Sequence, residues 1–317
     1  MSFNQKLVEY KKQIDLKLSD VYPNGPAVIQ EPIYHILSGG KRLRPILCLL
    51  TTEACKGNLD IAFEVGINIE LFHNFTLIHD DIMDEDVLRH GKTTIHNKWN
   101  NSIAILSGDG MLAIAMKRLS NMNIDNSEII DRFHDALIRV CEGQALDIDY
   151  QYKSKVTLDE YIDMIDKKTG HLIGMCSELG GIISNVSNDN QAKLRKYGEL
   201  LGRAFQIQDD LLEIVSNQDK MGKSLKSDFL LGKKTYISIK AKSIDEDYIS
   251  HVLKEANEDY NKGFKLYLEF LNKHDIINDT KSYIAELLDN TNSLLSSVDI
   301  NRENLHSFTK YVLKREY

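Results

Sequence analysis

The chain has 317 residues, of which 42% are hydrophobic and 27% charged, and its formal net charge is −8. This length is enough for one large domain or two ordinary ones, and the composition is that of a soluble globular protein. The negative balance argues against nucleic acid as the main partner.

The N-terminal segment and the cysteines indicate the compartment. Residues 1–20 are amphipathic, carry acids as well as lysines, and lack the apolar core of a signal peptide. We find no apolar run long enough to cross a bilayer, so stable membrane insertion is not expected. The four cysteines lack metal-ligand spacing and are interpreted as buried thiols of a reduced protein, with Cys141 and Cys176 as small core residues. We therefore expect a cytoplasmic protein.

Proline placement is the sharpest compositional clue to the fold. All four prolines fall within the first 45 residues, and residues 46–317 contain none. Proline interrupts helix interiors, so its absence permits a series of long helices. Alternating runs of β-branched residues bounded by tight turns are few. The predicted fold class is all-α.

Turns and apolar periodicity predict the helices in chain order. The turn Tyr22–Pro26 separates an N-terminal helix from a second helix over about Ile29–His35. Gly39–Pro45 is a strongly basic loop or helix start. Asp60–Glu85 is predicted as one long helix with an apolar stripe at three-to-four spacing. The stripe consists of Phe63, Ile67, Leu71, Phe75 and Ile78.

Helices recur through the rest of the chain without a linker, a low-complexity stretch or a clean repeat, which favours one domain. They are expected over Ile103–Ser120, Ser127–Tyr150, Leu158–Ile183, Gln191–Val215, Tyr236–Ala241, Asp247–Lys262, Phe264–Phe270 and Thr280–Ser296.

Two acid-rich helical segments, LIHDDIMDED and FQIQDDLLE, carry the first sign of chemistry. On a helix, Asp80 and Asp84 share one face, as do Asp209 and Glu213. Like charges at this spacing destabilise a helix, and the first cluster also sits at a C-terminal helix end, where the dipole disfavours acids. Divalent cations held between two such helices would offset both costs. We interpret the pair as a magnesium site for a diphosphate.

Five motifs then occur in order between Gly39 and Thr235: GGKRLRP, LIHDDIMDEDVLRHGKTTIH, KKTG, FQIQDD and GK…D…GKKT. This set resembles that of the trans-prenyl diphosphate synthases, the polyprenyl synthetase family. The resemblance implies one polyprenyl synthetase domain over residues 1–317. It also implies an all-α helical bundle around a central active-site cavity (the isoprenoid synthase type), and a homodimer.

The implied reaction is a head-to-tail condensation of isopentenyl diphosphate with an allylic diphosphate. Magnesium ions (Mg²⁺) bridge carboxylates to the diphosphate, stabilise charge as the carbon–oxygen bond breaks, and so trigger ionisation. By resemblance, Asp80 and Asp84 ligate two ions and Asp209 the third, with Asp81 and Asp210 in support.

The resemblance also assigns the basic residues, which suit phosphate oxygens. The allylic side comprises Arg89, Lys168, Gln206, Lys223 and Lys233. The isopentenyl diphosphate side comprises Lys41, Arg44, His73 and position 90. Thr169 and Gln206 are expected to stabilise the carbocation through their oxygens, and the departing pyrophosphate serves as the base.

Two positions depart from the family pattern. His90 stands where the family has a second arginine, and histidine lacks the charge and the planar fork of arginine near neutral pH. We therefore expect weaker binding of isopentenyl diphosphate that improves as pH falls. Glu213 replaces the usual Asp, which keeps the charge, so metal binding is expected to survive.

Product length has a local clue one turn before the first acid motif. The prenyl chain of the family grows beside this helix, where Phe75 is bulky and Thr76 small. Phe75 therefore favours a farnesyl or geranylgeranyl product, although core packing alone is the alternative interpretation. Other residues have weaker claims: His79 could orient Asp81 or be a satisfied buried histidine, and Met83 is expected to pack.

Other functions stay open at this point. A longer-chain polyprenyl synthase is one alternative, and a class I terpene cyclase or a non-catalytic synthase subunit are others. A cyclase does not need a second diphosphate site, for which this chain has Lys41 and Arg44. Non-catalytic subunits commonly lack one or both acid motifs, whereas this chain retains both. A purely structural helical scaffold would not explain so many acids and bases at matching positions.

Overall fold

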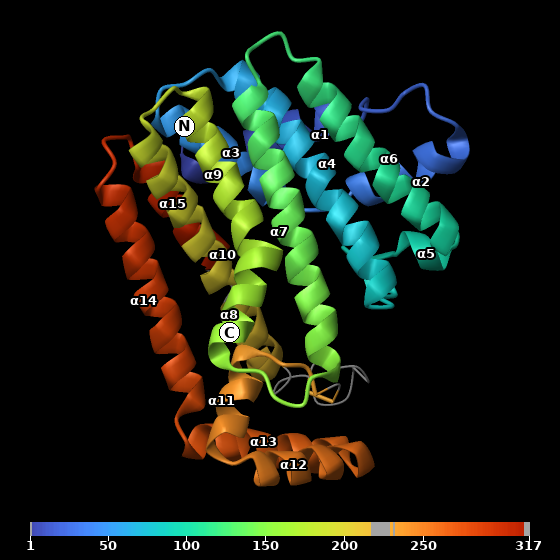
Figure 1. Cartoon of the computed structure of the whole chain (residues 1–317), viewed down its shortest axis with the longest axis vertical. Coiled ribbons are helices and arrows are strands. Elements are labelled where there is room, and N and C mark those ends of the chain that lie inside the picture. Colours follow the sequence, from blue (N-terminus) through green and yellow to red (C-terminus); the bar gives the residue numbers. More distant parts are fainter. Residues whose placement is uncertain (1, 217–228, 231, 314–317) are drawn as a thin grey trace. The chain divides into compact units, whose positions relative to one another are not determined.

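The computed structural model of the chain describes residues 2–216, 229–230 and 232–313. Its helices (Figure 1) fall into two compact units. Unit 1 comprises residues 1–134, 176–191 and 300–305, and unit 2 comprises residues 135–175, 192–299 and 306–317. The prediction of a single domain over residues 1–317 stays a prediction.

Unit 1 contains the N-terminal helices and a short hairpin. Its elements are α1 (Phe3–Leu18), α2 (Ala27–Leu37), α3 (Leu43–Ala54), α4 (Leu59–Met83), β1 (Leu88–Arg89), β2 (Lys92–Thr93), α5 (Ile95–Lys98) and α6 (Asn101–Ser120). The unit also includes the first residues of α7 (Ser127–Tyr152), α10 (Asn188–Ser216) and α15 (Glu303–Leu313), and most of α9 (His171–Ile183). In the described part of the chain the two-residue strands are the only strands, so the all-α prediction is confirmed.

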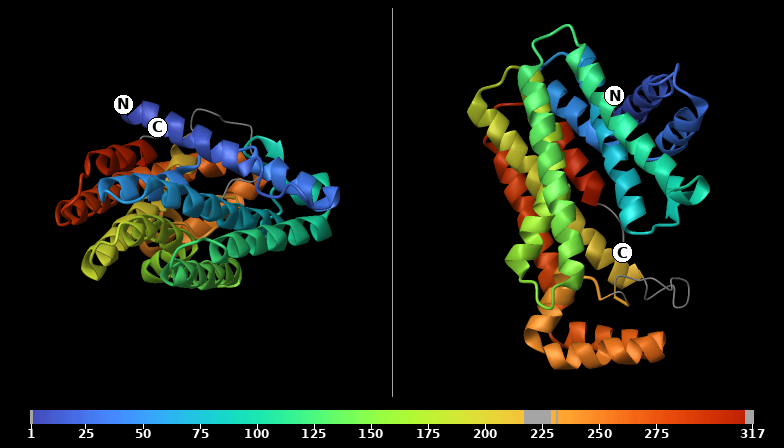
Figure 2. Two further views of the ribbon diagram at one scale, coloured as in Figure 1. Left: turned by 90° about the horizontal axis from the view of Figure 1, so that it is seen from above. Right: turned by 45° about the vertical axis from the view of Figure 1, so that its right-hand side comes forward.

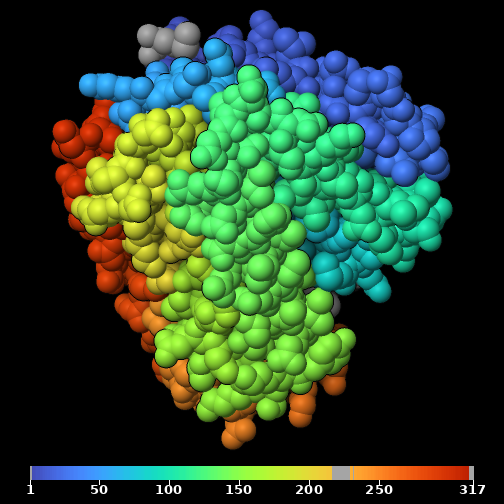
Figure 3. Space-filling view, turned by 45° about the horizontal axis from the view of Figure 1, so that its top comes forward, coloured from blue at the N-terminus to red at the C-terminus, as the bar shows by residue number. Residues whose placement is uncertain are grey.

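Helix α4 is the core of unit 1 and carries the first acid motif at its end. It packs against α1, α3 and α6, and the predicted stripe from Phe63 to Ile78 is buried. Figure 3 shows the surface where α2, in blue, adjoins the blue-green α6. Asn58 starts α4 because its side chain accepts the backbone N–H groups of Asp60 and Ile61.

The expectation that no run could cross a membrane is wrong by length and composition. Helix α4 (Leu59–Met83) is long and apolar enough, but 78% of its most apolar window is buried inside the protein. A helix that is apolar on all sides is the ordinary form of a core helix.

Unit 2 contains most of the C-terminal helices. Its elements are α8 (Leu158–Ile165), the π-helix η1 (Asp166–Gly170), α11 (Tyr236–Ile244), α12 (Glu246–Glu258), α13 (Tyr260–Lys273) and α14 (Ile276–Ser296), together with most of α7, α10 (Asn188–Ser216) and α15 (Glu303–Leu313) and the first turn of α9 (His171–Ile183). Helices α12 and α13 run side by side (Figure 2). One hydrophobic core joins α7, α8 and α10 to α11–α14, from Tyr150 on α7 to Leu287 on α14.

Several predicted helices needed correction. The helix predicted over Leu158–Ile183 is interrupted by the π-helix Asp166–Gly170. The helix predicted over Asp247–Lys262 breaks at Asp259, whose extended backbone ends α12 and whose side chain accepts the N–H of Lys262 to start α13. Helix α3 begins within Gly39–Pro45, which was interpreted as a loop or helix start, but its length was not predicted. Helices α5 and α15 and the hairpin were not predicted.

Two side chains also lie differently from the prediction. Cys141 is exposed on α7 instead of buried, whereas Cys48 and Cys176 are buried as expected. Met83 at the end of α4 is 44% exposed, so it is not a packed core residue.

Candidate functional site

The first acid motif occupies the last turn of α4. Asp80 is half-buried, Asp81 is buried, and Asp84 is exposed as the C-terminal cap. The Asp84 N–H donates to the Asp80 carbonyl over 2.8 Å, so the turn stays helical to this point. Asp80 and Asp84 therefore lie on one helix face, as predicted.

Asp81 holds Arg89 on the hairpin. Arg89 Nε donates to Asp81 Oδ1 over 2.7 Å, and Arg89 Nη2 donates to Asp86 Oδ2 over 2.8 Å. Burial raises the pKa of Asp81 to about 6, although the hydrogen bond and charge of Arg89 oppose this rise. Asp81 thus orients a predicted phosphate-binding arginine.

For His79, two interpretations were open: orienting Asp81, or being a satisfied buried histidine. Its ring lies edge-on to Phe75 at 4.8 Å between centroids, and its Nε2 is 3.6 Å from Asp109 Oδ1. Phe75 is buried and also stacks on Phe72 at 6.1 Å. Both the core-packing role and the chain-length role of Phe75 are compatible with this position, and neither is tested by it.

The residues predicted to bind isopentenyl diphosphate gather in unit 1. Arg44 Nη1 donates to His73 Nε2 over 2.9 Å. Because the arginine side chain cannot accept a hydrogen bond, Nε2 of His73 is the acceptor, and the ring proton of neutral His73 lies on Nδ1. Burial, followed by the charge of Arg44, lowers the pKa of His73 well below 6.5, so His73 is neutral near pH 7.

This pair has unused hydrogen-bonding capacity. Within the described residues, Arg44 Nε and His73 Nδ1 are buried and have no hydrogen-bond partner. A buried cation and buried donors without partners cost free energy unless an anion joins them. An anionic ligand is the natural complement of this pair.

The glycine loop and the hairpin complete this side of the site. A Cβ added at Gly39 would lie 3.0 Å from His90 Cβ, and one added at Gly40 would lie 3.6 Å from His90 Nε2. Lys41 is exposed on the same loop, and His90 is exposed at the hairpin turn with φ of 53°. A hollow beside the hairpin is lined by residues that include Gly39, Asp81, Arg89 and His90.

The second acid motif lies on α10 in unit 2. Asp209 and Glu213 are half-buried and four residues apart, so they share a helix face. Asp210 is buried, accepts a hydrogen bond from the Tyr161 hydroxyl, and accepts the Tyr236 N–H over 3.3 Å. Burial raises the pKa of Asp210 to about 6, opposed by the Tyr161 hydrogen bond and the charge of Lys233.

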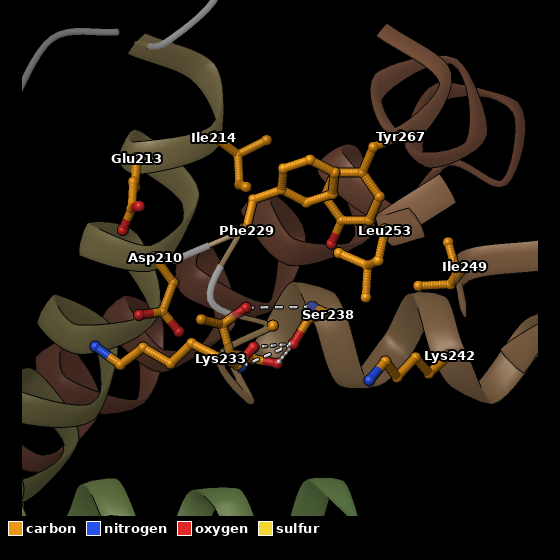
Figure 4. Close-up of a pocket in the computed structure, with 12 residues that line it drawn as sticks. Asp210, Glu213, Ile214, Phe229, Lys233, Ser238, Lys242, Ile249, Leu253 and Tyr267 are labelled. Atoms are coloured by element: carbon orange, nitrogen blue, oxygen red, sulfur yellow. Dashed lines mark hydrogen bonds between the residues drawn. The ribbon is translucent and has the colours of Figure 1, made fainter. Parts of the chain in front are cut away.

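Figure 4 shows the pocket beside this motif. The amine of Lys233 extends toward the Asp210 carboxylate, and Glu213 lies one turn along α10. The opposite wall is apolar and is formed by Ile214, Phe229, Ile249, Leu253 and Tyr267. The pocket therefore combines an acidic and basic rim with an apolar wall. Lys223, predicted for the allylic side, lies outside the described residues.

The KKTG motif forms the π-helix, a geometry that often marks functional sites. Lys168 Nζ lies 2.6 Å from Asp147 Oδ2, and Thr169 Oγ1 donates to Gln206 Oε1 over 3.3 Å. The structure thus brings Thr169 and Gln206 together, as the proposed pair of cation-stabilising oxygens requires. Gly143 permits this arrangement, since a Cβ there would lie 2.3 Å from the Lys168 nitrogen.

Sequence reasoning missed the partners of the motif residues. Asp147 lies 21 residues before its partner Lys168, Tyr161 lies 49 residues before Asp210, and neither belongs to a motif of its own. Arg42 and Glu70 were also missed, although an acid inside the apolar stripe of α4 is a signal that could have singled out Glu70.

The carboxylates of the two acid motifs can supply part of the ligand shell of magnesium. No group of three or more His, Cys, Asp or Glu side chains able to hold a metal occurs in the described part of the chain. Magnesium usually binds one or two carboxylates and completes its shell with water and substrate phosphates. The same-face pair Asp80 and Asp84, and the pair Asp209 and Glu213, supply such partial sets of oxygen ligands.

Comparison with known proteins gives concordant matches. The family model described as polyprenyl synthetase matches residues 26–267. A short chain isoprenyl diphosphate synthase of Methanothermobacter thermautotrophicus is 33% identical over 318 residues, covering 96% of this chain and 95% of the relative. A geranylgeranyl diphosphate synthase of Saccharolobus solfataricus is 35% identical over 80% of this chain and 75% of its own length. The solved geranylgeranyl pyrophosphate synthetase of Pyrococcus horikoshii superposes with a TM-score of 0.90 at 32% identity and covers 99% of both chains.

Proposed function

The chain belongs to the polyprenyl synthetase family, as its motifs predicted, and we propose that it condenses isopentenyl diphosphate head to tail with an allylic diphosphate. The expected product is a prenyl diphosphate of farnesyl or geranylgeranyl length. The observation that carries the proposal is the Arg44–His73 pair, because its buried, unpartnered nitrogens suit an anion and its contacts differ from those that hold Arg89 to Asp81 and Asp86. Two cationic centres suit two diphosphate substrates.

The chain's own residues divide the work of the reaction. Arg89, fixed by Asp81 and Asp86, is assigned to the allylic diphosphate, and so are Lys168 and Lys233. Isopentenyl diphosphate is held by Arg44, His73, Lys41 and His90. The oxygens of Thr169 and Gln206 stabilise the allylic cation, and the apolar surroundings keep water from it. The proton lost from the adduct goes to the departing pyrophosphate.

Magnesium is proposed as the cofactor, held by Asp80, Asp84 and Asp209. When bound, Mg²⁺ neutralises the charge that develops on the leaving diphosphate. Asp81 and Asp210 support these ligands indirectly, since their carboxylates are occupied by Arg89 and by Tyr161.

The state of the protein in the cell is a further part of the proposal. We propose one catalytic domain over residues 1–317, a homodimer, and a cytoplasmic location without stable membrane insertion. The similarity of the whole chain to a single short-chain synthase supports the first of these.

A class I terpene cyclase is the nearest rival. Such an enzyme needs one diphosphate site, so the Arg44–His73 pair would have no ligand to bind. The intact pair of acid motifs argues against a non-catalytic subunit.

Product analysis tests the proposal. The purified protein is incubated with magnesium, isopentenyl diphosphate and each short allylic diphosphate in turn, and the products are sized. We expect chains of farnesyl or geranylgeranyl length that form only when both substrates are present. Cyclised products formed without isopentenyl diphosphate would support the cyclase. Longer chains would show that the protein is a longer-chain synthase. The absence of any product from the protein alone would support a non-catalytic subunit.

A further inference from the structure

The basic motif GGKRLRP contains a residue that the proposed reaction does not use. Arg42 lies between Lys41 and Arg44, yet it is only 3% exposed, whereas Lys41 is exposed. Arg42 also caps the start of α3 with a left-handed backbone, at φ of 58° and ψ of 31°. A residue other than glycine is strained there, so other contacts must hold it in place.

Those contacts come from two helices and the end of a third. Arg42 Nη1 donates to Glu70 Oε1 on α4 over 2.7 Å, and Arg42 Nε donates to Asp15 Oδ1 on α1 over 2.8 Å. Its Nη2 donates to the carbonyl of Leu37, the last residue of α2. Burial disfavours the charge of Arg42, but Glu70 and Asp15 outweigh it and raise the pKa of the guanidinium.

Glu70 is the buried partner in this network. Its side chain is 4% exposed, and its Oε1 also accepts Asn74 Nδ2 over 3.1 Å. Asp15, in contrast, is 37% exposed and also pairs with Lys11. Glu70 is therefore the more deeply buried of the two carboxylates that hold Arg42.

The fixed arginine determines where its neighbours lie. Lys41 precedes Arg42 directly, and Arg44 sits in the first turn of α3, which begins after Arg42. A Cβ at Gly40 would lie 3.2 Å from Arg42 Nη1, 3.6 Å from His90 Nε2 and 3.8 Å from Glu70 Oε1. The loop that carries Lys41, the start of α3 and the hairpin residue His90 thus meet around one ion pair.

We propose that Glu70 is a positioning residue for isopentenyl diphosphate: through its buried ion pair with Arg42 it holds Lys41 and Arg44 where they bind this substrate. Glu70 touches no substrate itself. A buried ion pair is weak evidence for stability, because desolvation offsets most of the attraction, so a role in setting geometry accounts better for this pair. The inference rests on the proposed function and adds to it a residue outside the motifs.

The chain offers a control carboxylate on the same helix, with a side chain that is 41% exposed against 4% for Glu70. Glu64, also on α4, pairs with Lys17 on α1 at 2.7 Å and with Arg118 on α6 at 2.9 Å. This carboxylate joins α4 to two neighbouring helices, but none of its partners lies in the glycine loop or the hairpin. Loss of Glu64 should affect packing alone.

The test compares Glu70→Gln with Glu64→Gln in steady-state kinetics, with thermal unfolding measured in parallel. In Glu70→Gln we expect the KM for isopentenyl diphosphate to rise about tenfold, the equivalent of weakening one charge-assisted contact, with the allylic KM unchanged within about twofold. Glu64→Gln should leave both KM values at the wild-type level. Calorimetric titration of each protein with isopentenyl diphosphate alone should show the same weakening.

Several results would overturn the inference. An unchanged KM for isopentenyl diphosphate in Glu70→Gln would do so, as would an equal rise for both substrates or the same rise in Glu64→Gln. If Glu70→Gln does not fold, Arg42→Lys serves, because it keeps the charge, loses the planar fork and should show the same selective rise. A wild-type protein that forms no prenyl product would refute the proposed function instead, so the two failures are distinguishable.

Discussion

The two acid motifs share a pattern but differ in how they use their second aspartate. In both motifs the first and last acids are at least partly exposed on one helix face, and the second acid is buried. Asp81 is hydrogen-bonded by a cation, Arg89, whereas the hydrogen bonds to Asp210 come from the neutral groups of Tyr161, Tyr236 and Gln206, with the charge of Lys233 nearby. Burial raises both pKa values to about 6.

This difference separates two roles that the sequence pattern alone cannot distinguish. Asp81 positions a side chain that is proposed to bind substrate, so its charge matters for catalysis. Asp210 joins α10 to α8 and α11, so its capacity to accept hydrogen bonds matters more than its charge. Substitutions of the acids in the two motifs test this contrast.

The largest effects are expected where the motifs agree. Asp80→Asn and Asp209→Asn should each lower kcat/KM by about 10³-fold, because each removes a charged oxygen ligand from a proposed metal site. The rate should recover partly at higher magnesium concentration. Steady-state rates over a magnesium titration measure both effects. A large loss of kcat/KM in only one of the two variants would show that the two motifs do not contribute equally.

The second aspartates should respond unequally. Asp81→Asn should lower kcat/KM about a hundredfold, because Arg89 loses its carboxylate and a misplaced phosphate clamp is costly. Asp210→Asn should cost less than about tenfold, since an amide oxygen can still accept the Tyr161 and Tyr236 donors. Equal losses in the two variants would contradict the difference in role. Thermal unfolding of both proteins serves as the control for folding.

Product length is expected to depend on the first motif's helix. Phe75→Ala should lengthen the product by opening the floor of the prenyl channel. Phe133→Ala is the matched control, because Phe133 is also buried and also contacts Phe72, at 6.0 Å between centroids, but lies on α7. Chromatographic sizing of the products measures both. Unchanged product length in Phe75→Ala would leave core packing as its role.

The smallest effect concerns His90. Burial and then the charge of Arg89 lower its pKa below 6.5, with Arg42 and Lys92 acting in the same direction and Glu70 opposing. His90 is therefore mostly neutral at pH 7. Its protonation should strengthen diphosphate binding only as the pH falls below the usual pKa of a histidine, 6.5. His90→Arg should lower the KM for isopentenyl diphosphate about fivefold at pH 7, the effect of one added charged contact.

The pH profile supplies the control for that variant. The wild-type KM for isopentenyl diphosphate should fall between pH 7 and pH 5.5 relative to that of His90→Arg, whose charge is constant. Parallel profiles in the two proteins would show that His90 does not contact this substrate.

The sequence predicted the long helices because their apolar stripes are regular. Helix α4 and its buried face from Phe63 to Ile78 are the clearest case. The length of helix α3 was missed because nine of its twelve residues are buried, so no polar face marks the period. The break at Asp259 was missed because neither glycine nor proline marks it.

The same limit applies to the site. Motif residues such as Asp80, Lys168 and Asp209 could be singled out because their types and spacing suit diphosphate chemistry. Their partners could not, since the Tyr161–Asp210 and Arg42–Glu70 contacts join residues 49 and 28 positions apart and depend on tertiary packing. The sequence thus singled out the candidate groups, and the structure added what holds them.

The most direct test of the account is whether the protein binds two different diphosphates at once. Calorimetric titration in magnesium would use isopentenyl diphosphate and an unreactive thio-analogue of an allylic diphosphate, each added to protein already saturated with the other. The account predicts one molecule of each per chain without competition, with Arg44→Gln weakening only isopentenyl diphosphate and Asp80→Asn weakening chiefly the allylic analogue. Mutual exclusion of the two ligands would contradict it.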